Sequence, residues 1–164
     1  MTLFWAAAIV AVDALLLWLV LSGAPFVPSK KSAVEKFIFL AEIKPGDKAT
    51  DLGSGDGRIV IAMAKAGAEA HGFEINPGLV WWSRRKIRQA GLGGKAFIHQ
   101  ANLWKVDLSR FDVVTLFGVS HIMRRLEKKL ETELKPGSRI ISLAFKFPHW
   151  QISGRKEEVF LYKR

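Results

Sequence analysis

The chain of 164 residues has no cysteine and no long tract of basic residues, and its acidic residues are few. Without thiols it can form neither disulfides nor thiolate metal sites, and it has no cysteine nucleophile. We therefore predict no metal site. The 25 Lys and Arg residues exceed the 15 Asp and Glu residues, which gives a formal net charge of +10. A surplus of this size suits contact with an anionic lipid surface, an acidic partner or nucleic acid.

The first 24 residues lack basic side chains and contain one acid, Asp13. Apart from this acid, residues 3–21 form an apolar run of 19 residues. A helix of that length is roughly 28 Å long at ~1.5 Å per residue, which matches the apolar core of a bilayer. We predict a transmembrane anchor at residues 1–24. Asp13 would then lie in mid-span, either as a recognition point for a partner helix or as a tolerated polar residue.

A cleaved signal peptide is the alternative for this segment, because Ser22 and Ala24 fit the small-residue cleavage rule. Pro25 directly after that cut and the missing basic residue before the apolar run argue against cleavage. Three lysines follow the run between residues 30 and 36. By the positive-inside rule they place a single-pass protein with its second domain, residues 25–164, in the cytoplasm.

Residues 25–164 alternate between patterns typical of strands and of helices. Helices are expected at residues 32–41, 58–66, 77–90 and 122–134. Strands are expected at residues 48–52, 70–75, 96–100, 111–117, 139–144 and 157–162. This alternation predicts an α/β domain, with a parallel, Rossmann-like, doubly wound sheet that binds its ligand at the carboxyl ends of the strands.

Three glycines, at positions 53, 55 and 57, leave the first expected strand and enter a helix. Their spacing is G-x-G-x-G, which differs from the G-x-G-x-x-G of dinucleotide-binding folds. Asp51 before this glycine loop would repel a pyrophosphate but could accept an ammonium group. Glu74, at the end of the second strand, can accept both hydroxyls of a ribose. The set favours a nucleoside with a zwitterionic tail, as in S-adenosylmethionine (SAM), over a dinucleotide.

Several segments in order along residues 25–164 carry a resemblance to a known group of enzymes. They are Pro25-Phe26-Val27-Pro28-Ser29, Asp51-Leu52-Gly53-Ser54-Gly55-Asp56-Gly57-Arg58-Ile59, Phe73-Glu74-Ile75-Asn76-Pro77, Val113-Val114-Thr115-Leu116-Phe117 and Leu134-Lys135-Pro136-Gly137-Ser138-Arg139. The domain resembles the ATP synthase c-subunit lysine methyltransferase family and the similar archaeal broad-specificity protein-lysine methyltransferases. Many SAM enzymes share the glycine loop, but the P-F-V-P-S element together with that loop is more specific.

The resemblance implies SAM-dependent methylation of lysine side chains in proteins. It implies that the cofactor is held by Asp51, Gly53, Ser54, Gly55, Gly57, Glu74 and Asn102. Asn102 follows the third strand, where it can contact the adenine edge or cap a turn. The sequence departs from the family pattern at Leu143-Ala144 and at residues 147–150. Both departures concern the substrate side of the site.

A lysine attacks only as the neutral amine, although its free pKa is ~10.4. An apolar, aromatic channel would favour loss of the proton. Candidates for such a channel lie in the linker or near strand ends. They are Phe26, Trp104, Thr115, Phe117, Phe145 and Trp150. Each aromatic residue alone fits a core position better than a channel, and His121 fits the start of a helix better than a proton relay. We assign no general base from the sequence.

Three other functions fit parts of the sequence: methylation of RNA, methylation of a small molecule, and SAM binding in a non-catalytic membrane protein. Enzymes that methylate amino groups of nucleic acids usually carry Asn/Asp-Pro-Pro-aromatic after the fourth strand. Residues 117–120 read Phe-Gly-Val-Ser instead. The intact set of Asp51, glycine loop and Glu74 favours an enzyme. We therefore expect a protein substrate that presents its lysine on or near the membrane, and no nucleic-acid partner.

Overall fold

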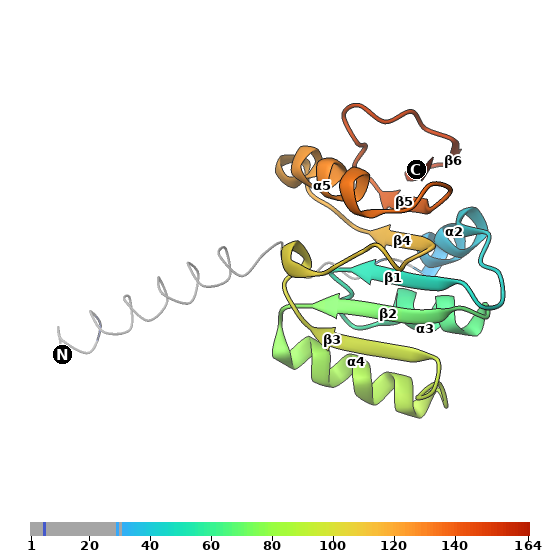
Figure 1. The fold of residues 1–164 in the computed structure, drawn as a ribbon. Helices are drawn as coiled ribbons and strands as arrows, with labels where there is room; N and C mark the ends of the chain where they lie inside the picture. The colour runs from blue at the N-terminus through green and yellow to red at the C-terminus, as the bar shows by residue number, and fades with distance from the viewer. Residues whose placement is uncertain (1–4, 6–28, 30) are drawn as a thin grey trace.

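The computed structural model describes residues 5, 29 and 31–164. One seven-stranded sheet runs through the domain in the order β3-β2-β1-β4-β5-β7-β6 (Figure 1). The strands are β1 (Lys48–Leu52), β2 (Glu69–Glu74), β3 (Ala96–Gln100), β4 (Val113–Leu116), β5 (Arg139–Leu143), β6 (Gly154–Lys156) and β7 (Val159–Lys163). The helices are α2 (Lys31–Ala41), α3 (Arg58–Lys65), α4 (Pro77–Gln89), the 3-10 helix η1 (Leu103–Lys105) and α5 (Ser120–Glu133).

The sheet is mixed, which corrects the prediction of a wholly parallel one. Strands β1 to β5 are parallel, but β7 runs antiparallel to β5, and β6 antiparallel to β7. Only residues 144–153 separate β5 from β6, and they contain no helix. This segment leads to β6, which runs in the same direction as β5. The turn at Glu157-Glu158 then sends the chain back as β7, which lies antiparallel between β5 and β6.

Two apolar layers enclose the sheet. One packs α2, α3 and α4 against one face, through residues such as Phe37, Val60 and Val80. The other packs α5 and residues 101–111 against the opposite face, through residues such as Leu126 and Phe111. All four residues of β4 are buried because helices or loops cover this central strand on both faces. The second layer has only one long helix, which leaves the carboxyl ends of the strands accessible beside it.

The predicted transmembrane anchor at residues 1–24 lies outside the described residues, and so does Phe26. Among the helices that the structure describes, none is long and apolar enough to cross a bilayer. The expected helices and strands of residues 31–164 are confirmed in kind and order. β6 was not expected, because Gly154-Arg155-Lys156 is short, polar and largely exposed.

Candidate active site

The glycine loop turns sharply at the end of β1 and is tied to β2. Gly53, Gly55 and Gly57 have φ angles of 78°, 51° and 78°, in the left-handed region that other residues avoid. The backbone amides of Gly53 and Ser54 both donate to the carbonyl of Phe73, at 2.9 and 3.1 Å. The loop therefore lies against the carboxyl end of β2. The space above Gly53 is open, since a Cβ there would meet no atom within 4 Å.

Close packing under the loop depends on two glycines. A Cβ on Gly57 would lie 2.9 Å from the Cβ of Ser83 on α4, so glycine is needed there for contact as well as for φ. A Cβ on Gly72 would lie 2.6 Å from the hydroxyl oxygen of Ser54. Gly72, a β2 residue that sequence analysis missed, therefore makes room for Ser54.

Asp51 is a buried carboxylate with no cation beside it among the described residues. It is 3% exposed, and its Oδ1 accepts a hydrogen bond of 2.8 Å from the hydroxyl of Thr115 on β4. Burial raises the pKa of Asp51 to about 7, against the opposing effect of the Thr115 hydrogen bond. The negative charges of Glu74 and Asp56 raise it further. A cationic group bound here would relieve both the burial and the repulsion.

Glu74 joins the glycine loop to the start of α4. Its carboxylate is buried, and one oxygen accepts from the amide of Gly55 at 2.9 Å. The other oxygen accepts from the amide of Asn76 at 2.8 Å. Each carboxylate oxygen has a second lone pair, so Glu74 can hold the loop and still accept hydroxyls of a ribose. Its predicted place at the end of the second strand is confirmed.

Ser54 has a buried hydroxyl with no hydrogen-bond partner among the described residues. Buried polar atoms are rarely left unpaired, because the loss of water costs ~1–3 kcal/mol. The hydroxyl therefore fits a ligand that completes it. Asn102, also predicted to bind the cofactor, is the N-cap of η1, and its side-chain oxygen accepts from the amide of Trp104 at 3.0 Å. Asn102 thus caps a turn, which is one of the two roles expected for it from the sequence.

Asp56 forms an ionic network that sequence analysis missed. It is buried, and its carboxylate accepts from Arg58 at 2.9 and 2.7 Å and from Lys86 of α4 at 2.8 Å. Burial alone would raise the pKa of Asp56, but the hydrogen bonds and charges of Arg58 and Lys86 outweigh it and lower the pKa to about 2. Arg58 also donates to the carbonyl of Ser29, the last residue of the P-F-V-P-S element. The network thus ties Ser29 to the glycine loop and to α4.

Two cavities flank the carboxyl end of β5 and meet at Ala144. The first has a volume of about 460 Å³ and is lined by Ser120, Met123, Arg124, Ala144, Phe145, Lys146 and Pro148. The second has about 390 Å³ and is lined by Ser29, Ser32, Ala33, Lys36, Phe117, Leu143, Ala144, Glu157, Glu158 and Val159. Phe117 and Phe145 stack between them, with ring centroids 6.4 Å apart. Ala144 has a φ of 64°, a strained value for a residue with a Cβ.

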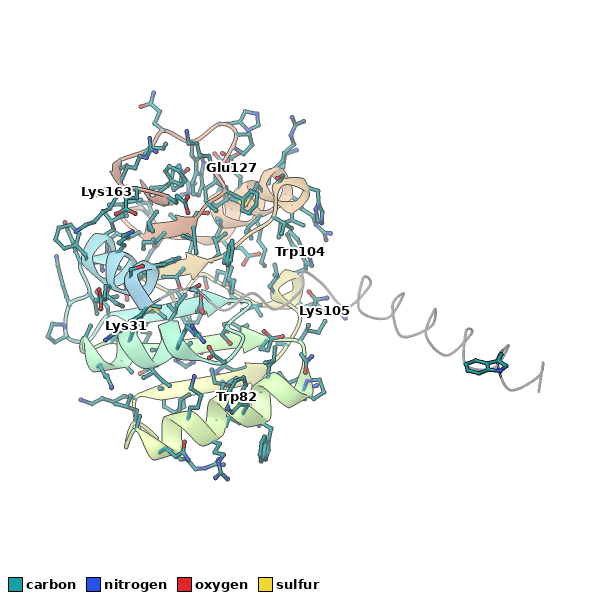
Figure 2. All side chains as sticks on the ribbon, turned by 180° about the vertical axis from the view of Figure 1, so that it is seen from behind. Lys31, Trp82, Trp104, Lys105, Glu127 and Lys163 are labelled. Carbon is teal, nitrogen blue, oxygen red and sulfur yellow. The ribbon has the colours of Figure 1, made fainter. Side chains whose placement is uncertain are left out.

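The structure divides the predicted channel residues. Phe117 and Phe145 line the cavities. Thr115 is fully buried and serves Asp51 instead. Trp104, on η1, lies under the guanidinium of Arg125 at 4.1 Å (Figure 2), and Trp150 packs on Phe147 and Tyr162. Thr115, Trp104 and Trp150 line neither cavity, because each side chain packs against or bonds to other residues of the fold.

Other described groups do not enlarge the site. His121 is exposed at the start of α5. In the described part of the chain, no three His, Asp or Glu side chains are grouped so that they could hold a metal ion. The candidate cofactor site therefore consists of the glycine loop, which includes Ser54, with Asp51 and Glu74; the two cavities at the carboxyl end of β5 are lined by other residues. Such an arrangement can hold a cationic nucleoside.

Comparison with known proteins shows which family the chain resembles. The family model described as the ANTKMT methyltransferase domain matches residues 51–154. The ATP synthase c-subunit lysine N-methyltransferases of Rattus norvegicus and Homo sapiens are 48% and 46% identical to the chain over 126 residues, or 77% of it. Those alignments cover 58% and 54% of the two proteins, so the chain spans little more than half the length of these curated relatives.

Two further relatives are covered more completely. A protein-lysine N-methyltransferase of Saccharolobus islandicus is 38% identical over 128 residues, which are 77% of this chain and 80% of that protein. The crystal structure of an RNA methyltransferase from Salinibacter ruber, in complex with S-adenosyl-L-homocysteine, has a TM-score of 0.77 and 33% identity. That match covers 84% of this chain and 92% of the other.

Proposed function

Because the chain belongs to the family of the ANTKMT methyltransferase domain, we propose that it transfers methyl groups from SAM to lysine side chains of proteins. SAM is the cofactor of this family of methyltransferases, and a relative of the same fold was crystallised with the corresponding product. One observation carries the proposal. The buried carboxylates of Asp51 and Glu74 and the unpartnered hydroxyl of Ser54 surround one glycine loop at the carboxyl edge of the strands.

The residues around the loop fit SAM group by group. SAM supplies a methyl group that its positively charged sulfur has already activated. Asp51 would accept the ammonium of the methionine part, which removes the cost of a buried carboxylate without a cation. Glu74 would accept ribose hydroxyls while it keeps its bonds to Gly55 and Asn76. Ser54 would gain the partner that its hydroxyl lacks.

The second cavity suits a lysine acceptor. Its lining includes the carboxylate of Glu158, which can attract an ammonium group, and the apolar side chains of Phe117 and Leu143. Neighbouring Glu157 is already paired with Lys36. Glu158 favours the ammonium form, whereas the apolar side chains of Phe117 and Leu143 favour the neutral amine, which is the form that attacks a methyl group. Alignment of that amine with an activated donor can supply much of the rate, so no general base is required.

We further propose a membrane anchor at residues 1–24 and a catalytic domain on the cytoplasmic side, with a target lysine on a membrane or membrane-proximal protein. The support is the apolar run in the sequence and the lysines that follow it. Ser29, which lines the second cavity, comes five residues after position 24. Five residues span at most ~18 Å. A bilayer at residue 24 would thus hold its proteins within reach of the site.

Methylation of RNA is a second candidate, favoured by one observation. The Salinibacter ruber relative at 33% identity is described as an RNA methyltransferase, and the chain carries a net charge of +10. Against it stands the sequence of residues 117–120, which lacks the Asn/Asp-Pro-Pro-aromatic loop. The two candidates differ in their acceptor atom, a lysine amine or a nucleotide, which one labelling experiment can separate.

The test uses the full chain in detergent, isotopically labelled SAM, and three acceptor pools: membrane proteins, soluble proteins and total RNA. We expect label on lysine residues of membrane proteins, identified by mass spectrometry of peptides. Asp51→Asn, which keeps the shape of the side chain but removes its charge, is the matched inactive control. Label confined to soluble proteins would contradict the membrane substrate, and label in RNA alone would contradict lysine methylation.

A further inference from the structure

Helix α4 exposes two tryptophans to solvent. Trp81 and Trp82 are 63% and 45% exposed, whereas Val80, Ser83 and Ile87 on the other side of the helix are buried against the sheet. At about 100° per residue, Arg85, Arg88 and Gln89 fall on the same outward side as the two indoles. We call this set, Trp81, Trp82, Arg85, Arg88 and Gln89, the α4 tryptophan face. Two adjacent exposed indoles on one helix face are more than a scattered apolar residue and mark a contact surface.

The charge of this face is entirely positive. α4 contains no acidic residue. Its other two cations point elsewhere, since Arg84 donates to the carbonyl of Ile98 and Lys86 to Asp56. Arg85 and Arg88 are exposed and have no side-chain hydrogen bond or ion pair with any residue of the described chain. Tryptophan beside arginine on one side of a helix is the composition of helices that lie on anionic membrane surfaces.

The helix that carries the α4 tryptophan face begins at the same edge of the sheet as the candidate site. α4 begins directly after the carboxyl end of β2, where Glu74 holds the glycine loop. Figure 2 labels Trp82 on this helix. The ammonium of Lys86 lies 5.4 Å from the centre of the Trp82 ring and is also bonded to Asp56 of the loop. A surface bound at Trp82 is therefore linked to the loop by a single side chain.

We propose that the α4 tryptophan face rests on the surface of an anionic bilayer, with its indoles among the lipid headgroups. The proposed contact rests on the proposed function in one respect: it requires the membrane anchor that brings a bilayer close to the domain. The apolar run ends at Leu21, eight residues before Ser29, and eight residues span at most ~28 Å. The missing acids on α4 and the net charge of +10 favour lipid phosphates over an uncharged surface.

The experiment uses the absence of cysteine, because one introduced cysteine can carry a polarity-sensitive fluorophore. Gln89→Cys places the label on the α4 tryptophan face and keeps both indoles. Lys163→Cys places it on β7, which the strands β2, β1, β4 and β5 separate from β3 in the sheet order. The full chain is reconstituted into vesicles of phosphatidylcholine, alone or with phosphatidylglycerol. Flotation of the vesicles reports the anchor, and the emission of the label reports the contact.

We expect a blue shift for the label at position 89 in phosphatidylglycerol vesicles alone, and none at position 163. High salt should reverse the shift, because it screens charge at the membrane surface. Arg85→Gln and Arg88→Gln should each lower the ratio of docked to free label about fivefold. Trp81→Ser with Trp82→Ser should abolish the shift. Phe39→Ser, at an aromatic ring that is 64% exposed on α2, is the matched control and should not.

Several results would overturn the proposal. A chain that floats with the vesicles but shows equal emission at both positions keeps the anchor and loses the contact. A chain that does not float with the vesicles would contradict both the anchor and the membrane contact. Methyl transfer to lysine is measured separately, in detergent, and would not be contradicted by that result. A shift produced by an RNA oligonucleotide and not by lipid would assign the face to nucleic acid. A shift that depends on protein density and not on lipid charge would assign it to a second copy of the chain.

Discussion

Single side chains set the chemistry of the site, and Asp51 is the clearest case. A buried carboxylate without a cation is costly, and Asp51 keeps one hydrogen bond, from Thr115, in compensation. Asp56 is only five residues away and equally buried, yet Arg58 and Lys86 hold its pKa at about 2 while that of Asp51 is about 7. Asp56 is therefore already paired with cations of the protein, whereas Asp51 has no cationic partner among the described residues. The second is the one suited to bind a ligand.

We predict that SAM affinity rises with pH up to about 7 and then levels off. The pKa of Asp51 in the free protein is raised to about 7, so the carboxyl holds a proton below that pH. An ammonium binds only the ionised form, so affinity should fall about tenfold per pH unit below 7. Calorimetric titration between pH 5.5 and 8 measures this, and Asp51→Asn should bind weakly at every pH. A wild-type affinity that is constant over this range would contradict the assignment.

The same shift has a consequence for stability, with the opposite sign. Between pH 3.8 and about 7 the native protein keeps the Asp51 proton while the unfolded chain loses it. The contribution of Asp51 to stability is thus complete below pH 3.8 and is lost as pH rises to about 7. In urea titrations, Asp51→Asn should gain on the wild type across this window. An equal pH dependence for both proteins would show that Asp51 titrates normally.

Glu127 on α5 holds the loop that borders the first cavity. Its carboxylate accepts from the amides of His149 and Trp150, at 2.9 and 2.8 Å, and contacts the His149 ring at 2.7 Å. Pro148 and Lys146 of the same loop line that cavity. We predict that Glu127→Ala costs ~1–3 kcal/mol in the free energy of unfolding, because two partly buried backbone amides lose their acceptor. It should also raise KM for a protein substrate more than it lowers kcat.

Glu127→Gln is the matched control for that prediction. Its amide oxygen still accepts from the backbone, so the free energy of unfolding and KM should both recover most of the loss. Urea denaturation and initial rates measure the two effects. If alanine and glutamine behave alike in both assays, the loop is not held by this acceptor.

At the scale of helices and strands, the sequence predicts most of the fold because the pattern is strong where an element is buried. β1 and β3 have the predicted bounds. β4 is shorter than expected. Phe111 is buried in the core, but it closes a turn in which its backbone amide donates a hydrogen bond to the carbonyl of Leu108. Buried positions require apolar residues, so burial can be predicted from residue types. The ends of a strand depend on hydrogen bonds to its neighbours, which residue types do not show. β6 has no apolar pattern and could not be predicted.

The glycine loop gives a prediction about packing between elements. Gly57→Ala places a Cβ 2.9 Å from the Ser83 Cβ on α4, at a φ of 78°. We expect a loss of ~1–3 kcal/mol in the free energy of unfolding, measured by urea denaturation, together with weaker SAM binding. Gly93→Ala, where a Cβ meets nothing and φ is not positive, is the control and should be nearly neutral. Equal losses at both glycines would show that neither the contact with Ser83 nor the φ of Gly57 causes the cost.

For the whole molecule, the cofactor half of the site was predictable and the substrate half was not. Asp51, the glycines and Glu74 are neighbours through β1 and β2, so their spacing along the chain predicts their meeting. The cavities instead join residues from α2, β4, β5 and the β6–β7 turn, which are brought together only by the antiparallel return of the chain. Thr115 was expected in the channel for the same reason, since its place at the centre of the sheet depends on strand order.

The final prediction tests which nucleotide the whole domain accepts. A ligand that binds only the folded chain stabilises it by ~2.7 kcal/mol at a concentration of one hundred times its Kd. For a chain of 164 residues, this corresponds to a rise in Tm of about 5–11 °C. We expect SAM to produce such a rise in differential scanning fluorimetry at pH 8. NAD should produce none, because the ionised Asp51 and Glu74 repel a pyrophosphate at the glycine loop. Asp51→Asn should lose most of the response to SAM, since the ammonium then has no carboxylate to meet. A comparable shift with NAD would show that the glycine loop binds phosphate groups. That result would contradict the assignment of Asp51 to the ammonium group of SAM.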